Sequence, residues 1–150
     1  ARVMAYPHPV IVACNGHCFA MGVFLMLSAD HVIGSRGDFT ISANEVAIGM
    51  TMPRVAAAVL RQRLTPAAYQ RAVTLSEFFS VDSALQSGFF DELVQPDALL
   101  GRAGQVAEDL RQLHARAHKD SKRRIRARPL PARTSATVDC RRSPTTLASS

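Results

Sequence analysis

Short apolar runs bounded by turn residues make up most of the first fifty positions. The β-branched run 10–14 is followed by Asn15-Gly16, which predicts a fully buried strand that ends in a turn. Residues 21–29 carry helix formers on nearly every side, so we expect an enclosed helix rather than an amphipathic one. Segments 31–35 and 38–41 have the lengths and side-chain types of strands. Fully apolar strands of this kind are typical of a parallel sheet.

The second half of the chain has a helical spacing of apolar residues. Val55, Val59 and Leu60 recur at that spacing after Pro53. Thr65-Pro66 supplies an N-cap and a first-turn proline for a further helix. The remaining expected elements are a helix over 81–86 capped by Ser80 and stopped by Gly88, an extended segment over 89–94, and one long helix from Asp97 to about His118.

The composition, with 47% hydrophobic and 20% charged residues in 150 positions, is that of one globular domain. The net charge of +6 is uneven, because residues 1–100 carry 6 basic and 8 acidic side chains and residues 101–150 carry 12 and 4. Residues 127–150 are rich in Ser, Thr and Pro and contain no aromatic residue. We therefore expect a domain over 1–126 and a disordered basic tail over 127–150. The tail is either a genuine extension or the product of a shifted reading frame or premature truncation.

The three cysteines, Cys14, Cys18 and Cys140, lack disulfide-like spacing, which favours free thiols in a reducing, cytoplasmic compartment. The uncharged stretch 3–29 is long enough to raise the question of membrane insertion. Two prolines and an Asn-Gly pair interrupt it, so we expect a core helix and no membrane span. No start methionine or leader is recognisable, and we expect the chain to begin within a domain.

Three patterns that could carry chemistry are better explained by ordinary structure. Cys14 and Cys18 lie on either side of a histidine, but no second ligand pair has zinc spacing, and we expect no metal site. His114 and His118 lack the glutamate of a zinc-binding helix, and we expect them on a solvated helix face. The basic segment 119–128 has no aromatic residue to stack on bases, so we expect a solvated helix end rather than nucleic-acid binding.

A more specific pattern runs through residues 9–53. It consists of the run 9–22 (PVIVACNGHCFAMG), followed by Asp30, Phe39, Asn44-Glu45, Gly49 and Pro53. This pattern resembles the enoyl-CoA hydratase/isomerase (crotonase) family, and the resemblance extends over about 1–126. It implies an α/β, crotonase-like fold of repeated strand-strand-helix units with a helical C-terminal half. The family's N-terminal third has no counterpart here.

In that family, two backbone N–H groups hold the thioester oxygen of an acyl-CoA. The resemblance places one of these donors at Met21, where the family's usual three glycines read Ala20-Met21-Gly22, and the other in the absent third. The two carboxylates of the hydratases would fall at Phe24 and Glu45, and only Glu45 is acidic. The resemblance thus implies Glu45 as catalytic residue, Met21 as oxyanion donor, and Ala20, Phe24, Asn44 and Met52 as substrate-binding residues.

A single carboxylate suffices to move a double bond, whereas adding water calls for two. The resemblance therefore favours a Δ3,Δ2-enoyl-CoA isomerase of fatty-acid β-oxidation. One alternative is an enoyl-CoA hydratase of weak activity, and another is a truncated, non-catalytic remnant that binds partners through its basic tail. The implied partners are an acyl-CoA substrate and, at full length, further copies in a homotrimer. CoA enters only as part of the substrate, and no cofactor is expected.

Overall fold

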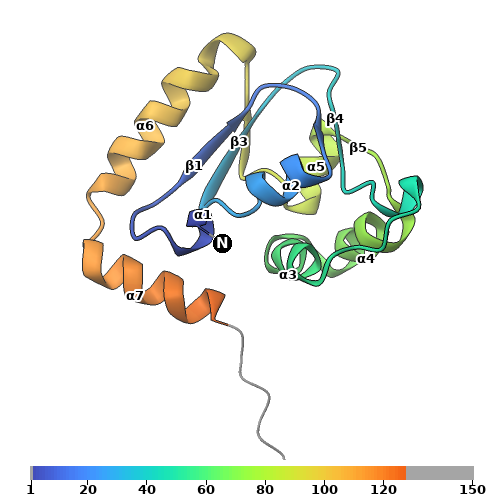
Figure 1. Cartoon of the computed structure of the whole chain (residues 1–150). Coiled ribbons are helices and arrows are strands. Elements are labelled where there is room, and N and C mark those ends of the chain that lie inside the picture. Colours follow the sequence, from blue (N-terminus) through green and yellow to red (C-terminus); the bar gives the residue numbers. More distant parts are fainter. Residues whose placement is uncertain (1, 128–150) are drawn as a thin grey trace, which may run out of the picture.

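Two small sheets form the centre of the structure (Figure 1). The computed structural model describes residues 2–127. In the first sheet, β1 (Ile11–Cys14), β3 (His31–Ser35) and β6 (Glu92–Val94) pair in this order, and all run parallel. In the second, β2 (Cys18–Phe19), β4 (Thr40–Ser42) and β5 (Phe79–Ser80) pair in this order, with β2 parallel and β5 antiparallel to β4. The expected parallel sheet is confirmed.

Helices surround these sheets and connect their strands. They are α1 (Arg2–Ala5), α2 (Met21–Met26), α3 (Arg54–Arg63), α4 (Pro66–Leu75), α5 (Val81–Ser87), α6 (Leu99–Arg111) and α7 (Ala115–Arg126), with the 3-10 turns η1 (Val46–Ile48) and η2 (Pro96–Ala98). α6 packs against β1 and β3, whereas α7 returns beneath the molecule to contact α1 (Figure 1). α3 contacts both α2 and α4, so it links the start of the chain to the helical second half.

Local capping signals set several element boundaries where the sequence predicts them. The Thr65 hydroxyl accepts a hydrogen bond from the Ala68 N–H (3.3 Å), with Pro66 opening α4. The Ser80 hydroxyl accepts from the Ser83 N–H (3.3 Å) and begins α5. Gly88 ends α5 with a φ of 94°, a left-handed conformation that favours glycine. The strand predicted over 31–35 is confirmed with the same bounds.

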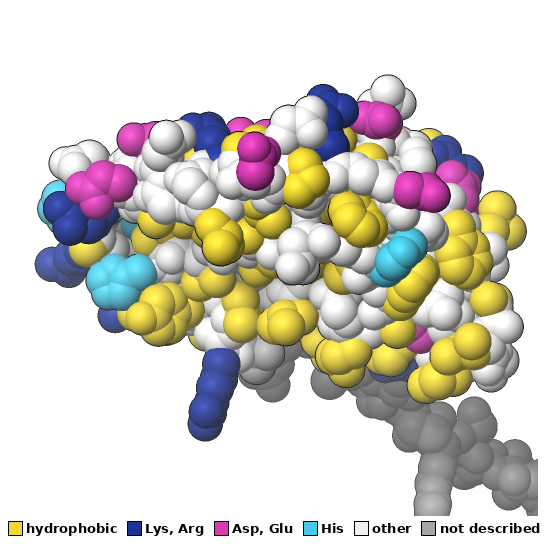
Figure 2. Space-filling view, turned by 90° about the horizontal axis from the view of Figure 1, so that it is seen from above, with side chains coloured by type: hydrophobic (Ala, Val, Ile, Leu, Met, Phe, Trp, Pro, Cys, Tyr) yellow, Lys and Arg dark blue, Asp and Glu magenta, His cyan; other side chains and the backbone are white. Residues whose placement is uncertain are grey.

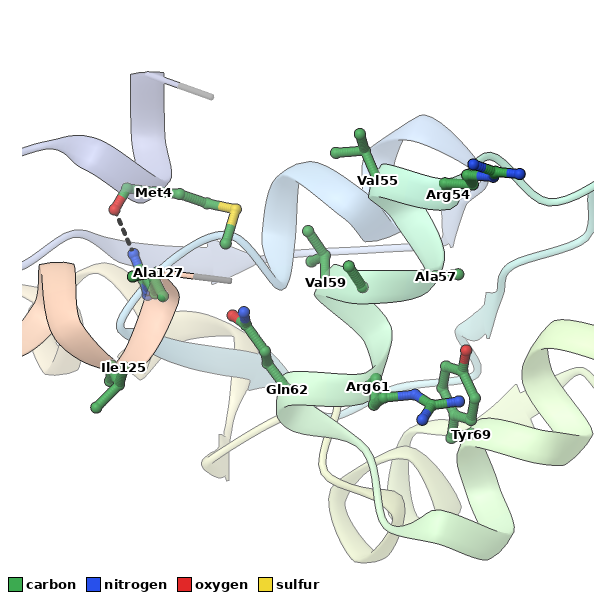
Figure 3. A pocket seen from close by; sticks show the side chains of 12 residues that line it. Met4, Arg54, Val55, Ala57, Val59, Arg61, Gln62, Tyr69, Ile125 and Ala127 are labelled. Atoms are coloured by element: carbon green, nitrogen blue, oxygen red, sulfur yellow. Dashed lines mark hydrogen bonds between the residues drawn. The ribbon is translucent and has the colours of Figure 1, made fainter. Parts of the chain in front are cut away.

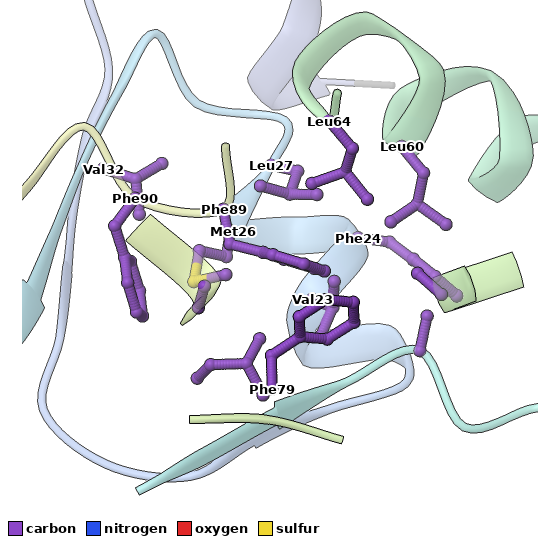
Figure 4. Close-up of a cluster of buried hydrophobic side chains, with 14 of the residues drawn as sticks. Val23, Phe24, Met26, Leu27, Val32, Leu60, Leu64, Phe79, Phe89 and Phe90 are labelled. Atoms are coloured by element: carbon purple, nitrogen blue, oxygen red, sulfur yellow. The ribbon is translucent and has the colours of Figure 1, made fainter. Parts of the chain in front are cut away.

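The main core is built around α2 (Figure 4). Val23 and Phe24 of this helix are buried in the same cluster as Leu60 of α3. Phe79 and Phe89 belong to this cluster too, and their rings are tilted by 50° to one another with centroids 4.9 Å apart. A smaller core lies beneath α6 and consists of Ile33, Leu99 and Val106, with partly buried neighbours from β1 and β6. Because three of the six residues of α2 are buried in the larger cluster, its position is fixed by packing rather than by helix propensity.

Two burial predictions for the N-terminal half are wrong. The run that forms β1 is half-buried rather than fully buried, because within residues 2–127 this strand pairs on one side only, with β3. The helix expected over 21–29 ends at Met26 and is not enclosed, since Met21 is 73% and Leu25 57% exposed. One face of α2 fills the core and the other reaches the surface.

The long helix expected from Asp97 to about His118 is also wrong. The chain forms α6, leaves helical geometry after Arg111, and starts α7 at Ala115. His114 is the N-cap of α7, and its Nδ1 accepts a hydrogen bond from the Ala117 N–H (3.3 Å). The break lets α6 lie along the first sheet while α7 turns toward α1, which one straight helix could not do.

The Asp30 carboxylate explains why α7 turns inward. It accepts hydrogen bonds from the Val10 N–H (2.8 Å), Lys122 Nζ (2.5 Å) and an Arg126 guanidinium nitrogen (2.9 Å). Lys122 also donates to the His8 carbonyl (3.1 Å), and its side chain is only 4% exposed. The solvated helix end expected for this basic segment is therefore wrong at Lys122 and Arg126. Residue 127 is exposed, and the rest of the tail expected over 127–150 lies outside the described residues.

Several large hydrophobic side chains remain at the surface. Figure 2 shows hydrophobic side chains gathered toward one border of a face whose opposite border carries acidic and basic ones. Phe19 and Phe78 are 39% and 58% exposed, and their ring centroids lie 6.1 Å apart. His17 stacks on Phe19 (6.0 Å) and meets Phe39 edge-on (5.6 Å). These four rings form a partly exposed aromatic cluster beside the second sheet.

Replacing Asp30 tests the importance of its ion cluster. Asp30→Asn leaves the cations of Lys122 and Arg126 without their counter-charge in a largely buried site. We expect the free energy of unfolding to fall by about 3 kcal/mol, because unpaired buried charges are strongly destabilising. Urea denaturation followed by circular dichroism measures this change.

Asp38→Asn is the matched control, because Asp38 is exposed and makes no ion pair among residues 2–127. We expect this variant to stay within about 0.5 kcal/mol of the unmodified chain. Equal losses in the two variants would contradict the structural role given to Asp30.

Candidate active site

Two paired strands bring the two halves of the expected site together. β2 and β4 run parallel, with Cys18 opposite Ile41 and Phe19 opposite Ser42. Ala20 and Met21 follow β2, and the segment that leads to Glu45 follows β4. Because the carboxyl ends of parallel strands meet at one edge of a sheet, segments distant in the sequence become neighbours here.

The turn at Ala20 sets the direction of the Met21 N–H. Ala20 has φ 47° and ψ −118°, a backbone conformation that non-glycine residues rarely adopt. Its N–H donates to the Ser42 carbonyl (3.0 Å), and its own carbonyl accepts from the Val23 N–H (3.0 Å). Met21 is the first residue of α2, and within the described residues its N–H makes no backbone hydrogen bond. The turn thus presents a free donor at a position fixed by β4.

Glu45 is buried although it carries an ionisable group. Only 4% of the residue is exposed, and its Oε2 has no hydrogen-bond partner among residues 2–127. The adjacent Asn44 Oδ1 is buried and unpaired in the same part of the structure. Burying a carboxylate oxygen without a partner is costly, so its presence in a folded chain calls for an explanation, of which a functional role is one.

Ser76 holds the segment that carries Glu45, a role that the sequence analysis missed. The Ser76 hydroxyl accepts from the Ala47 N–H (3.0 Å), and the Ser42 hydroxyl donates to the Ser76 carbonyl (3.4 Å). Ser76 can face both groups because it ends α4 in the left-handed conformation (φ 50°, ψ 39°). The Glu45 carbonyl in turn accepts from the Met50 N–H (2.8 Å). No sequence signal indicates this arrangement, since serine seldom adopts that conformation.

An apolar cavity of about 550 Å³ opens beside the start of α2. Met21, Phe24 and Leu25 line one side, and Val55 and Val59 of α3 line another. Phe24 both fills the core and faces the cavity. The other expected site residues, Ala20, Asn44, Glu45 and Met52, are not in its lining; Met52 packs half-buried against the main core.

A second cavity, of about 740 Å³, lies between α3 and the end of α7 (Figure 3). It shares Met4, Val55 and Val59 with the first, so the two cavities adjoin one another along α3. The Arg61 guanidinium lies over the Tyr69 ring, 4.8 Å from its centroid. None of the expected site residues lines this cavity, so its larger size does not make it the better candidate.

The described residues show no cluster suited to a metal ion. Between residues 2 and 127, no group of three or more His, Cys, Asp or Glu side chains converges. Cys14 and Cys18 are free thiols. In the same part of the chain, no helix has both the length and the hydropathy needed to cross a membrane.

Comparison with known proteins identifies relatives of this arrangement. A family model described as enoyl-CoA hydratase/isomerase matches residues 1–148. The peroxisomal enoyl-CoA delta isomerase 2 of Arabidopsis thaliana is 36% identical over 76 residues, which are 51% of this chain and 32% of that protein. The structure of an enoyl-CoA hydratase from Mycobacterium marinum is 46% identical, with a TM-score of 0.79 over 83% of this chain and 55% of that one.

A structure described as an enoyl-CoA isomerase from Mycobacterium tuberculosis is 42% identical, with a TM-score of 0.80 and the same coverage. The chain spans about half the length of these solved relatives and 32% of the Arabidopsis isomerase. The crotonase-like α/β fold expected from the resemblance is confirmed. By the match of its sequence and the likeness of its structure, the chain belongs to the enoyl-CoA hydratase/isomerase family.

Proposed function

We propose that this chain carries the active site of a Δ3,Δ2-enoyl-CoA isomerase of fatty-acid β-oxidation, with Glu45 as its acid and base. The main support is the buried Glu45 carboxylate, whose Oε2 is unpaired within residues 2–127. β4 brings it to the same sheet edge as the Met21 N–H. Phe24 lines the cavity beside Met21, and no carboxylate does, as expected for an enzyme that lacks the first hydratase acid.

The proposed reaction starts with removal of a proton from C2 of a 3-enoyl-CoA by Glu45. The electron pair of the broken C–H bond moves toward the thioester carbonyl, and negative charge develops on its oxygen. The Met21 N–H donates a hydrogen bond to that oxygen and stabilises the dienolate. Glu45 then returns the proton at C4, and the double bond lies between C2 and C3. Atoms and charges balance without any cofactor beyond the CoA of the substrate.

The remaining expected residues take supporting roles in this proposal. The strained Ala20 turn aims the Met21 N–H, and the Phe24 ring keeps water from the acyl chain. Asn44 brings a second unpaired buried oxygen beside Glu45 and could orient the substrate. Met52, half-buried against the core, would complete the acyl-binding wall. The expected trimer and the cytoplasmic location belong to the proposal as well, and exposed apolar residues such as Phe19 and Phe78 support self-association.

An enoyl-CoA hydratase is the second candidate. It is favoured by the 46% identity to the Mycobacterium marinum structure described as a hydratase. Phe24 is evidence against a hydratase, because it occupies the position where the resemblance places the first hydratase acid. A protein with Glu45 alone would position the attacking water poorly, so the expected hydration rate is low.

Glu45→Gln tests the proposed acid and base. Glutamine keeps the size of the side chain but cannot exchange a proton, so we expect kcat for conversion of 3-enoyl-CoA to 2-enoyl-CoA to fall by about 10²–10⁴-fold. The absorbance of the conjugated 2-enoyl thioester measures the rate in a full-length version of the protein, which also supplies the second oxyanion donor. Glu108→Gln, a change on the exposed surface of α6, should leave kcat unaltered. An unchanged rate in Glu45→Gln would rule out the assignment.

Met21→Pro tests the proposed oxyanion donor. Proline is tolerated at the first position of a helix but has no N–H, so the variant removes the donor from the site. We expect kcat to fall by about 10²–10³-fold. Met21→Ala, which keeps the N–H and shortens the exposed side chain, should retain most of the activity. If both variants lose activity equally while their urea midpoints stay unchanged, the side chain and not the N–H is important.

A further inference from the structure

We propose that the cavity between α3 and the end of α7 binds a fatty-acid carboxylate, with the head group on Arg61 and the chain along the apolar wall. The volume of this cavity, about 740 Å³, lies within the usual range for small-molecule sites. None of the residues to which the isomerase reaction is assigned lines it. The inference therefore does not rest on the proposed function.

The charged residues that line this cavity are all basic. They are Arg54, Arg61 and Arg126, and none of the described residues in the lining is acidic. In the described part of the chain, Arg54 and Arg61 take part in no ion pair. Arg126 shares the single carboxylate of Asp30 with Lys122, so one positive charge of that cluster is not compensated. The cavity therefore attracts anions.

Apolar side chains from α1, α3 and the end of α7 form most of the remaining wall. They are Met4, Val55, Ala57, Ala58, Val59, Ile125 and Ala127. Val55 is 74% and Ile125 77% exposed, so apolar surface is open to solvent on both α3 and α7. Covering such surface is favourable, and a bare inorganic anion would leave most of it in water. An anion that carries an apolar chain uses both properties of the cavity.

Arg61 is held in a position that favours binding of the head group. Its guanidinium carbon lies over the Tyr69 ring, 4.8 Å from the ring centroid, and Figure 3 shows the two side chains facing one another. This attraction restricts the guanidinium without using a hydrogen-bond acceptor, so its N–H donors stay available. Two parallel N–H groups of an arginine match the two oxygens of a carboxylate. One fixed guanidinium suits a singly charged head group better than a phosphate dianion.

Arg54 has a different part in the proposed site. It begins α3, seven residues before Arg61, so the two arginines lie about two turns apart on the same side of the helix. The corresponding distance along the helix axis is about 10 Å, and a carboxylate bound to Arg61 has no need of a direct contact with Arg54. Arg54 therefore contributes its positive charge to the cavity rather than a specific hydrogen bond.

Isothermal titration calorimetry of the 150-residue chain tests the class of ligand. The probes are decanoate, decyltrimethylammonium and acetate below micelle-forming concentrations, which separate the effect of the charge from that of the chain. We expect one decanoate per chain, bound more tightly than either other probe by about tenfold or more. Equal affinity for the decyl cation would indicate a purely apolar surface, and equal affinity for acetate a site for bare anions. Either result would overturn the proposal.

Conservative substitutions distinguish the two arginines. Arg61→Lys keeps the charge but loses the planar pair of donors, so we expect the affinity for decanoate to fall by about tenfold. Arg54→Lys keeps the charge that Arg54 supplies and should bind decanoate as the unmodified chain does. The matched control is Arg124→Gln, which removes a charge from the exposed surface of α7 outside the cavity. It should change the affinity by less than about twofold because of screening by salt.

Equal losses in Arg61→Lys and Arg54→Lys would contradict the role given to Arg61, and so would an unchanged affinity in Arg61→Lys. Urea midpoints measured on the same samples show that the variants are folded, since both side chains are exposed.

Two further variants locate the bound decanoate. Of the two adjoining cavities, Ala58 lines only the proposed site, and Leu25 lines only the cavity beside the start of α2. Ala58→Phe fills the proposed site and should abolish binding, whereas Leu25→Phe should leave the affinity unaltered. Binding that survives Ala58→Phe and is lost in Leu25→Phe would place the ligand in the other cavity and overturn the proposal.

Methyl NMR spectra of the unmodified chain provide a direct view of the contact. Decanoate should shift the signal of Ile125, which lines the cavity, and leave that of Ile48 in η1 in place. An unshifted Ile125 signal at saturating decanoate would rule out the site. Such a failure would leave the isomerase proposal untouched, because none of these measurements uses an acyl-CoA.

Discussion

The Asp30 carboxylate is the contact on which the arrangement of the chain depends. It lies where α2 has ended and β3 is about to begin, and it holds the backbone before β1 as well as two cations of α7. Arg126 extends this network to the carbonyls of Met4 (3.0 Å) and Ala29 (3.0 Å). The Asp30 side chain thereby links α7 to the backbone before β1, and through Arg126 it also links α7 to α1. A shift of α2 along its axis would move Asp30 and break these hydrogen bonds.

Prediction from sequence succeeded where a boundary depends on a few adjacent residues. The caps at Thr65, Ser80 and Gly88 act through their own backbone or the next turn, so the local sequence contains the whole signal. It failed for the helix break before Ala115, because the reason for that break is an ion pair between residues more than ninety positions apart. Helical spacing continues across the break and gives no warning of it.

The residues of the candidate site came from a family resemblance, and their catalytic roles stay a prediction. The placement of the two segments that carry them depends on the parallel pairing of two very short strands, β2 and β4. Strands of two or three residues have no recognisable alternation. The positioning of the Glu45 segment by Ser76 was missed altogether, because it depends on a left-handed serine and not on any motif.

Ala20 stands where the resemblance places a glycine of the family. Its backbone is held in a conformation that costs of the order of 1–3 kcal/mol for a residue with a Cβ. That strain is present whether or not a ligand is bound, so the folded chain is less stable than one with glycine there. Glycine would relieve the strain but also widen the range of directions open to the following N–H. The Ala20 methyl group therefore lowers the stability of the folded chain and, in return, restricts the directions in which the Met21 N–H can point.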